Sequence, residues 1–249
     1  MPTARLNGID LYYEDHGSGP PVVLMHGYSD TSQAWQPQIA ALSPRYRLVT
    51  FDMRGHGRTR SPDDPAQYSE AHVVADLAAL LRRLEIERAI IGGLSLGGYM
   101  SLRFHIAHPE MVRALVLCDT GPGYRNAEAR AEWNQRAFTR ADELESKGFD
   151  ALRRNAGHTS AVGLARAARG MLAQFDSAAI DCLPKITVPT LVIVGSEDTP
   201  FLGATEYMAK KIPGARRVVI EGAGHVANVD RPEAFNAALL PFLAEVFGE

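Results

Sequence analysis

The chain has only two cysteines among its 249 residues, Cys118 and Cys182. They lie far apart and lack the spacing of a metal-ligand pair, so the sequence favours neither a metal site nor a disulfide framework. Cys118 ends a strand-like apolar run, which is typical of a buried thiol. Neither cysteine stands in a turn that leads into a helix, and we therefore expect no cysteine nucleophile.

Long apolar runs and blocks of one charge are also missing. No segment approaches the run of about 20 apolar residues that a membrane-spanning helix needs, and residues 1–6 contain no apolar core of signal-peptide length. The net charge is −3 and no basic run occurs, which argues against nucleic acid or an anionic membrane as a partner. We expect a cytoplasmic protein, a monomer or homodimer, that acts on a small molecule.

Short apolar runs alternate with helical patterns along most of the chain. Runs this apolar are typical of strands buried on both faces, and the strand–helix alternation predicts a parallel sheet. The dipeptide Asn7-Gly8 lies between alternating segments and predicts a hairpin that adds an antiparallel edge. The strand-like runs are Val22–Met25, Tyr46–Phe51, Ile90–Ile91, Ala114–Cys118, Thr190–Val194 and Arg217–Ile220. The expected fold is α/β, with a mostly parallel eight-stranded sheet flanked by helices.

The alternation stops at Thr120. Residues 121–185 are rich in Ala and Arg, helical in pattern and without a convincing strand, and four glycines are expected to divide them into short helices: Gly148, Gly157, Gly163 and Gly170. A connection of this length is far longer than a crossover needs. We expect a core formed by residues 1–120 and 186–249, with 121–185 as a small helical lid over the carboxyl edge of the sheet, where such sheets bind ligands.

The segment Gly93–Gly97 carries the strongest chemical signal. Ser95 lies between a predicted strand and a predicted helix, with a glycine two residues away on each side. A reversal this tight predicts an unfavourable backbone conformation at the serine, and the glycines remove Cβ atoms that would collide with neighbouring elements. The hydroxyl is then exposed at the sheet edge, beside a helix amino-terminus that favours a developing anion. Ser95 is therefore the candidate nucleophile, although small residues also make good turns.

A serine nucleophile needs a base and an acid that orients the base. Among eight histidines, His225 follows the last predicted strand on a glycine-rich loop, which places it at the same sheet edge as Ser95. Asp198 and Asp119 each follow a strand and are competing candidates for the acid. Two further histidines, His56 and His158, are possible neighbours of the site.

These segments together resemble an α/β-hydrolase over nearly the whole chain, from about Leu6 to Phe247. The matching pieces are His26-Gly27, Asp52–Gly57, the Ser95 turn, Gly195–Asp198 and Gly224-His225. The resemblance implies the catalytic order Ser95, Asp198, His225, which favours Asp198 over Asp119 as the acid. It also implies an oxyanion hole made by the backbone N–H groups of Tyr28 and Leu96, a structural role for His26, and no metal or organic cofactor.

The serine at position 95 favours acyl transfer, because the haloalkane dehalogenases and epoxide hydrolases of this fold use an aspartate there. We therefore expect a serine hydrolase that cleaves a carboxylic ester of a small, largely apolar acyl compound through an acyl-enzyme, with loss of activity as His225 is protonated near pH 6.5. An enol-lactonase, a carbon–carbon bond hydrolase and a non-catalytic ligand receptor are the alternatives.

Aromatic residues are the candidates for substrate contact: Trp35, Tyr124, Trp133, Phe138 and Phe201. For any one of the lid residues among them, the sequence favours internal packing of the short helices over contact with a substrate. The stretch Asp119–Arg125 is also similar, over a short length, to the start of the lid in menaquinone-pathway lyases of this fold. Arg125, Arg130 and Arg136 could bind a substrate carboxylate, or could form a solvated helix face.

Overall fold

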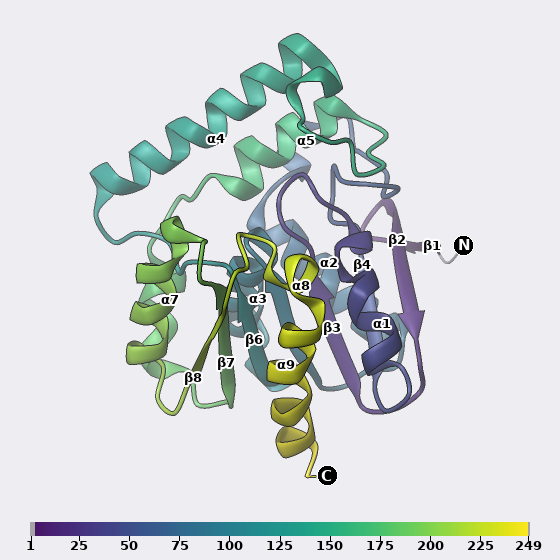
Figure 1. The fold of residues 1–249 in the computed structure, drawn as a ribbon. Coiled ribbons are helices and arrows are strands. Elements are labelled where there is room, and N and C mark those ends of the chain that lie inside the picture. The colour runs from purple at the N-terminus through teal and green to yellow at the C-terminus, as the bar shows by residue number, and fades with distance from the viewer. Residues whose placement is uncertain (1–2, 249) are drawn as a thin grey trace.

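The computed structural model describes residues 3–248 and contains one eight-stranded sheet (Figure 1). Its strands are β1 (Thr3–Leu6), β2 (Ile9–His16), β3 (Pro21–Met25), β4 (Arg47–Phe51), β5 (Ala89–Leu94), β6 (Val112–Cys118), β7 (Thr190–Gly195) and β8 (Arg216–Ile220). The strand order is β1-β2-β4-β3-β5-β6-β7-β8. β1 and β2 pair antiparallel with each other, β2 pairs antiparallel with β4, and all other pairs are parallel. The predicted fold, including the hairpin at Asn7-Gly8, is confirmed.

The helices cover both faces of this sheet and one of its ends. They are α1 (Gln36–Leu42), α2 (Glu70–Arg83), α3 (Leu96–Ala107), α4 (Ala127–Lys147), α5 (Ala161–Ala167), α6 (Ala178–Cys182), α7 (Thr199–Lys211), α8 (Ala227–Asp230) and α9 (Pro232–Phe247). One core cluster joins the sheet to α2, α3 and α7, and a second joins its other face to α1 and α9. Every residue of β5 and β7 is buried. The apolar runs of the sequence are continuous because helices cover both faces of these strands.

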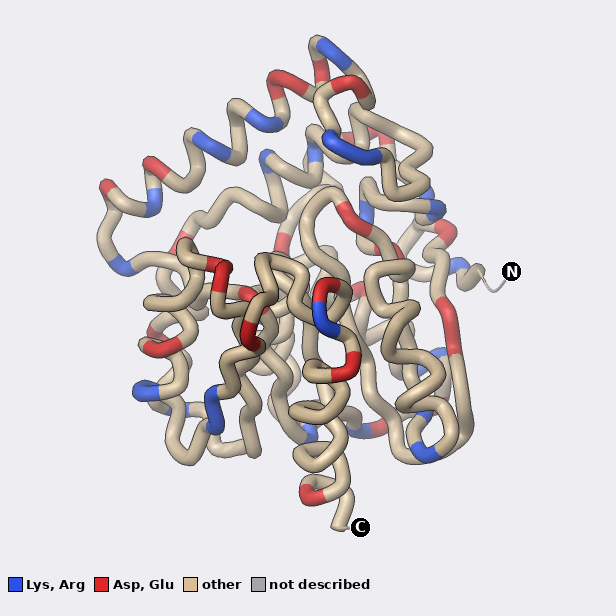
Figure 2. The backbone as a smooth tube through the Cα atoms, viewed as in Figure 1, with Lys and Arg blue, Asp and Glu red and all other residues tan. Residues whose placement is uncertain are grey.

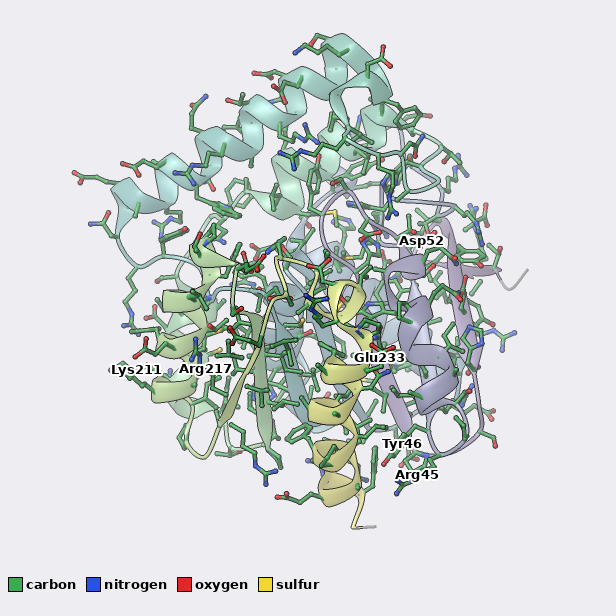
Figure 3. The ribbon with its side chains drawn as sticks, viewed as in Figure 1. Arg45, Tyr46, Asp52, Lys211, Arg217 and Glu233 are labelled. Atoms are coloured by element: carbon green, nitrogen blue, oxygen red, sulfur yellow. The ribbon has the colours of Figure 1, made fainter. Side chains whose placement is uncertain are left out.

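The chain between β6 and β7 contains no strand and lies across one end of the sheet, with α4 uppermost (Figure 1). We call residues 121–185 the helical segment. Figure 3 shows Asp52 at this same end of the molecule and Tyr46 at the opposite end. Tyr46 packs there against Phe247, with ring centroids 5.7 Å apart, so the carboxyl-terminal helix closes the end of the molecule remote from the helical segment.

Two of the glycines expected to break the helical segment have a different role. Gly163 lies inside α5, and Gly170 lies inside a π-helical turn, Ala168–Leu172, that continues it. A Cβ at Gly170 would lie 1.7 Å from the carbonyl oxygen of Tyr68, and one at Gly163 would lie 2.3 Å from the Ser61 hydroxyl. These glycines therefore allow close packing on the 61–68 loop. Gly148, with φ +60°, does end α4 as predicted.

No helix within residues 3–248 combines the length and apolar character that crossing a bilayer requires.

Candidate active site

Ser95 occupies a strained turn between β5 and α3. Its φ of 52° and ψ of −113° lie outside the ordinary regions for a residue with a side chain. The turn is held from both sides, because the Ser95 N–H donates to the Cys118 carbonyl at 2.8 Å and the Thr120 hydroxyl donates to the Ser95 carbonyl at 2.6 Å. The predicted strain is confirmed, and strain of this kind persists where surrounding contacts determine the backbone.

The glycines on either side of Ser95 allow strand, turn and helix to come together. A Cβ at Gly93 would lie 2.4 Å from the backbone carbon of Gly97, and one at Gly97 would lie 2.3 Å from the Met25 carbonyl oxygen. Both distances are shorter than real Cβ contacts allow. Gly27 lies across the turn, where a Cβ would be 3.4 Å from the Ser95 Cβ. The β3 and β5 turns therefore meet at the serine.

His225 and Asp198 complete a chain of hydrogen bonds from Ser95. The His225 Nε2 lies 3.0 Å from the Ser95 Oγ, and its Nδ1 lies 2.9 Å from the Asp198 Oδ2. Asp198 precedes α7 but makes no capping bond to it, and its side chain is 3% exposed. Glu197 beside it is exposed. The arrangement has the distances of a nucleophile, a base and an orienting acid.

The environment of His225 favours its protonated form. Partial burial lowers the pKa of this imidazole, but the hydrogen bond that its Nδ1–H donates to Asp198, the charge of Asp198 and the further charge of Asp119 outweigh that effect, so the pKa is raised. The side chain is 43% exposed, and the Phe201 ring stacks on it with centroids 4.9 Å apart. We therefore expect His225 to lose its proton above the ordinary pH for a histidine.

Asp119, the competing acid, makes no hydrogen bond to His225 within residues 3–248. Its carboxylate is fully buried and accepts hydrogen bonds from the Gly195 N–H at 2.8 Å and the Ala227 N–H at 3.1 Å. Burial raises the pKa of Asp119 to about 6, against the opposing effect of these hydrogen bonds. Asp119 thus links the loop that carries Asp198 to the loop that carries His225.

Tyr28 and Leu96, the predicted oxyanion donors, belong to the two turns that meet at Ser95. Leu96 is the first residue of α3, so its N–H has no acceptor within the helix. The Tyr28 N–H makes no hydrogen bond within residues 3–248, whereas its hydroxyl donates to the Leu164 carbonyl at 2.9 Å. Two unpaired backbone donors therefore remain on the turns around the serine.

A cavity of about 160 Å³ opens beside Ser95. Its lining residues come from the Ser95 turn, the helical segment and α7, and include Tyr124, Trp133 and Phe201. These three of the predicted substrate-contact residues thus line the cavity. A volume of this size is comparable to an engineered cavity that takes up benzene.

Trp35 and Phe138 do not line this cavity among the residues described. Trp35 is fully buried in the core cluster under α1 and α9, and its ring lies 6.0 Å from that of Phe235. The chain after β3 turns Trp35 back onto the sheet face, where apolar burial stabilises it. Phe138 lies on α4, two residues beyond the turn of that helix that faces the cavity at Trp133 and Arg136.

Three histidines form a buried row where the helical segment, which contributes one of them, meets the core. The ring centroids of His26 and His56 are 4.9 Å apart, and those of His56 and His158 are 5.8 Å apart. His26 accepts from the Met53 N–H at 2.9 Å, and His158 accepts from the Gly57 N–H at 2.9 Å. Burial lowers the pKa of both His56 and His158. His26 shapes its turn as predicted, while His56 and His158 join the core to the helical segment and do not line the cavity.

Some lining residues carried no signal in the sequence. Thr120 holds the Ser95 carbonyl, and Gln174 places a buried amide at the cavity. Gln174 lies in the loop between the π-helical turn and α6, where no local feature of the sequence reveals which way a polar side chain points. Only the packing of the helical segment identifies it. Within residues 3–248, no three side chains of His, Cys, Asp or Glu are grouped as a metal-binding set.

The model of the alpha/beta hydrolase family matches residues 22–238. The chain therefore belongs to the alpha/beta hydrolase family.

Several solved structures share this architecture. A thermophilic esterase from Thermogutta terrifontis, solved with malate bound, superposes with a TM-score of 0.87 at 28% identity, covering 98% of each chain. The enol-lactonase from Burkholderia xenovorans LB400 gives 0.79 at 28% identity over 98% of this chain and 100% of that one. A bromoperoxidase from Bacillus anthracis gives 0.77 at 26% identity over 94% and 95%. These similar proteins carry different names, so similarity alone assigns this chain no single substrate.

Proposed function

We propose that this protein is a serine hydrolase that cleaves the carboxylic ester of a small acyl compound through an acyl-enzyme intermediate. The observation that carries the proposal is the hydrogen-bonded chain Ser95–His225–Asp198 at the edge of the cavity. A serine hydroxyl is a poor nucleophile unless a base takes its proton. The 3.0 Å contact with the His225 Nε2 is within the range for that transfer.

In the first half-reaction, the His225 Nε2 removes the Ser95 proton as the Ser95 Oγ forms a bond to the ester carbonyl carbon. The carbonyl oxygen becomes an oxyanion, for which the N–H groups of Tyr28 and Leu96 are the donors, and each such donor contributes about 3 kcal/mol in other enzymes. The carbon–oxygen bond to the alcohol then breaks, and His225 returns the proton to the departing oxygen. Asp198 accepts a hydrogen bond from the Nδ1–H throughout and stabilises the imidazolium.

In the second half-reaction, His225 takes a proton from water, whose oxygen attacks the acyl carbon. Collapse of this intermediate breaks the bond to the Ser95 Oγ, which regains its proton as the carboxylic acid leaves. The chemistry needs no group beyond these side chains and backbone donors. Tyr124, Trp133 and Phe201 give the cavity an aromatic lining for the substrate.

Labelling and turnover test this proposal together. A fluorophosphonate should add covalently to Ser95 of the folded protein, and p-nitrophenyl esters of short acids should be hydrolysed. Ser95→Ala should abolish the adduct and lower kcat by roughly 10⁴-fold or more. Ser146→Ala is the matched control, because Ser146 lies on α4 and donates to the Asp142 carbonyl; both activities should survive it.

Ester turnover that persists in Ser95→Ala, or folded wild-type protein that gives no adduct, would overturn the mechanism. A panel of lactones and vinylogous diketones beside the esters separates the enol-lactonase and carbon–carbon hydrolase alternatives. The preferred substrate is the one with the highest kcat/KM that depends on Ser95.

A further inference from the structure

Most polar side chains around the cavity already have partners within the protein. Ser95 contacts His225, the Thr120 hydroxyl donates to the Ser95 carbonyl, the Tyr99 hydroxyl donates to Glu70, and the Trp133 indole donates to the Leu172 carbonyl. Two nitrogen-bearing side chains of the lining, Arg136 and Gln174, differ from these. Their hydrogen-bonding capacity is free for a bound molecule.

Arg136 is the cation of the cavity lining. Figure 2 shows Lys and Arg interspersed with Asp and Glu along α4. Two other arginines near the start of this helix have partners within the protein. Arg125 pairs with Asp181, and Arg130 donates to the Tyr124 carbonyl at 3.1 Å. Arg136 makes no hydrogen bond or ion pair within residues 3–248, not even with Glu132 one turn earlier on α4. Arg136 is thus an exposed residue at the edge of the cavity whose guanidinium has no partner among the described residues.

Gln174 provides a second, independent sign that the cavity takes a polar ligand. Its side chain is buried, with the residue 6% exposed, yet the Oε1 atom has no hydrogen-bond partner among the described residues. Two hydrogen bonds of 2.7 Å hold the backbone of Gln174 to Asn134 of α4. The Gln174 N–H donates to the Asn134 Oδ1, and the Asn134 Nδ2 donates to the Gln174 carbonyl. A buried acceptor without a partner costs about 1–3 kcal/mol. A ligand that supplies a donor here would remove that cost.

We propose that the substrate of this hydrolase carries a free carboxylate, which Arg136 binds while the reacting ester or lactone carbonyl lies at Ser95. The inference rests on the function proposed above. Arginine is suited to this role because its planar guanidinium donates two parallel hydrogen bonds to a carboxylate. Gln174 accepts a hydrogen bond from a hydroxyl or N–H of the same substrate. The favoured class is therefore the half-ester of a small dicarboxylic acid that also carries a hydroxyl or N–H group, or a lactone that bears a free carboxylate, rather than a wholly apolar ester.

A pair of substrates that differ in charge tests the proposal. Mono-p-nitrophenyl glutarate carries the carboxylate, and its methyl ester has nearly the same shape without the charge. Wild-type protein should hydrolyse the anion with a kcat/KM about tenfold above that of the methyl ester, mainly through a lower KM. Arg136→Gln should remove this preference, so that the ratio of the two kcat/KM values falls to about one. Arg136→Lys should keep part of the preference for the anion. Arg130→Gln, the control on the same helix, should keep all of that preference.

Labelling gives a readout that does not depend on turnover of either ester. Glutarate itself should slow the reaction of the fluorophosphonate with Ser95 in the wild type, and should not do so in Arg136→Gln. Equal rates for the two esters, or a preference that survives Arg136→Gln, would overturn the carboxylate proposal while leaving the serine hydrolase intact. Failure of the fluorophosphonate to label Ser95 at all would instead overturn the underlying function. Glutarate protection that is equal in both proteins would mean that the anion binds elsewhere.

Discussion

At the scale of single residues, Asp119 shows how a buried charge can shape a site that it does not enter. Its two carboxylate oxygens accept hydrogen bonds from the N–H groups of Gly195, the last residue of β7, and Ala227, the first residue of α8. Gly195 precedes the loop that carries Asp198, and Ala227 follows the loop that carries His225. The pKa of about 6 leaves Asp119 mostly ionised at neutral pH. That negative charge is one of the causes that raise the pKa of His225. Asp119 therefore helps to position the loops of the acid and the base, and it adds to the effect of Asp198 in raising the pKa of the base.

The pH dependence of kcat/KM tests this role. Because the pKa of His225 is raised above its ordinary value of 6.5, the neutral base is lost on acidification at a pH above 6.5, and wild-type activity should fall there. Asp119→Asn removes one negative charge and keeps one carbonyl acceptor, so it should shift the acid limb to lower pH. Asp230→Asn is the control, since Asp230 accepts the Gly224 N–H on the same loop and is not among the groups that raise this pKa. An unmoved limb in Asp119→Asn would contradict the electrostatic role.

At the scale of elements, the junction of β3, β5 and α3 depends on backbones that touch. The Met25 carbonyl lies where a side chain on Gly97 would begin, so neither β3 nor α3 could remain in place with a larger residue there. The same approach brings the turn after β3, with Tyr28, next to the turn that carries Ser95. Close packing at Gly97 is thus a condition for the oxyanion donors and the nucleophile to face one another.

Gly97→Ala should consequently damage both stability and activity. The new Cβ would lie 2.3 Å from backbone atoms, which cannot rotate away, so we expect a loss of about 1–3 kcal/mol or more in the free energy of unfolding. Gly203→Ala is the matched control, because Gly203 lies inside α7 with open space around its Cβ position. That change should stabilise the protein by about 0.5–1 kcal/mol. Urea denaturation followed by circular dichroism measures both, and similar results for the two variants would refute the packing argument.

At the scale of the whole molecule, a buried ion pair joins parts of the chain that are distant in sequence. Arg54, on the loop after β4, pairs with Asp76 of α2, and both side chains are almost fully buried. The Asn7 Nδ2 donates to the Asp76 Oδ1 at 2.9 Å, which brings in the amino-terminal hairpin. The pair therefore fixes the hairpin, α2 and the 52–57 loop against one another, at the end of the molecule that carries the helical segment.

Removal of one partner would leave the other charge buried and alone. Asp76→Ala should lower the free energy of unfolding by about 3–5 kcal/mol. Asp176→Ala, which removes an exposed carboxylate from Arg103 while leaving Glu70 as its partner, should cost less than about 1 kcal/mol. Chemical denaturation of the two variants gives the comparison. Equal costs would show that burial of the Arg54–Asp76 pair has no special effect on stability.

The sequence alone was sufficient to predict the fold. Apolar runs indicate which segments are buried, and each strand or helix corresponds to a local pattern. The sequence was also sufficient for the strained turn at Ser95, since a strand, a helix and two glycines within five residues permit few geometries. It was insufficient inside the helical segment, where Gly163 and Gly170 looked like breaks between helices. These glycines instead allow close packing against residues about 100 positions earlier in the chain. No local sequence pattern contains that contact.

Tertiary structure decided which side chains meet. Asp119 and Asp198 both follow strands, but the hydrogen bonds of Asp119 turn it toward backbone, and Asp198 reaches His225. Trp35 and Phe201 both adjoin predicted site segments, yet one is buried under α9 and the other stacks on the imidazole. The physical reason is that a local pattern fixes where the backbone runs, while the direction and partners of a side chain depend on what the rest of the chain packs against it.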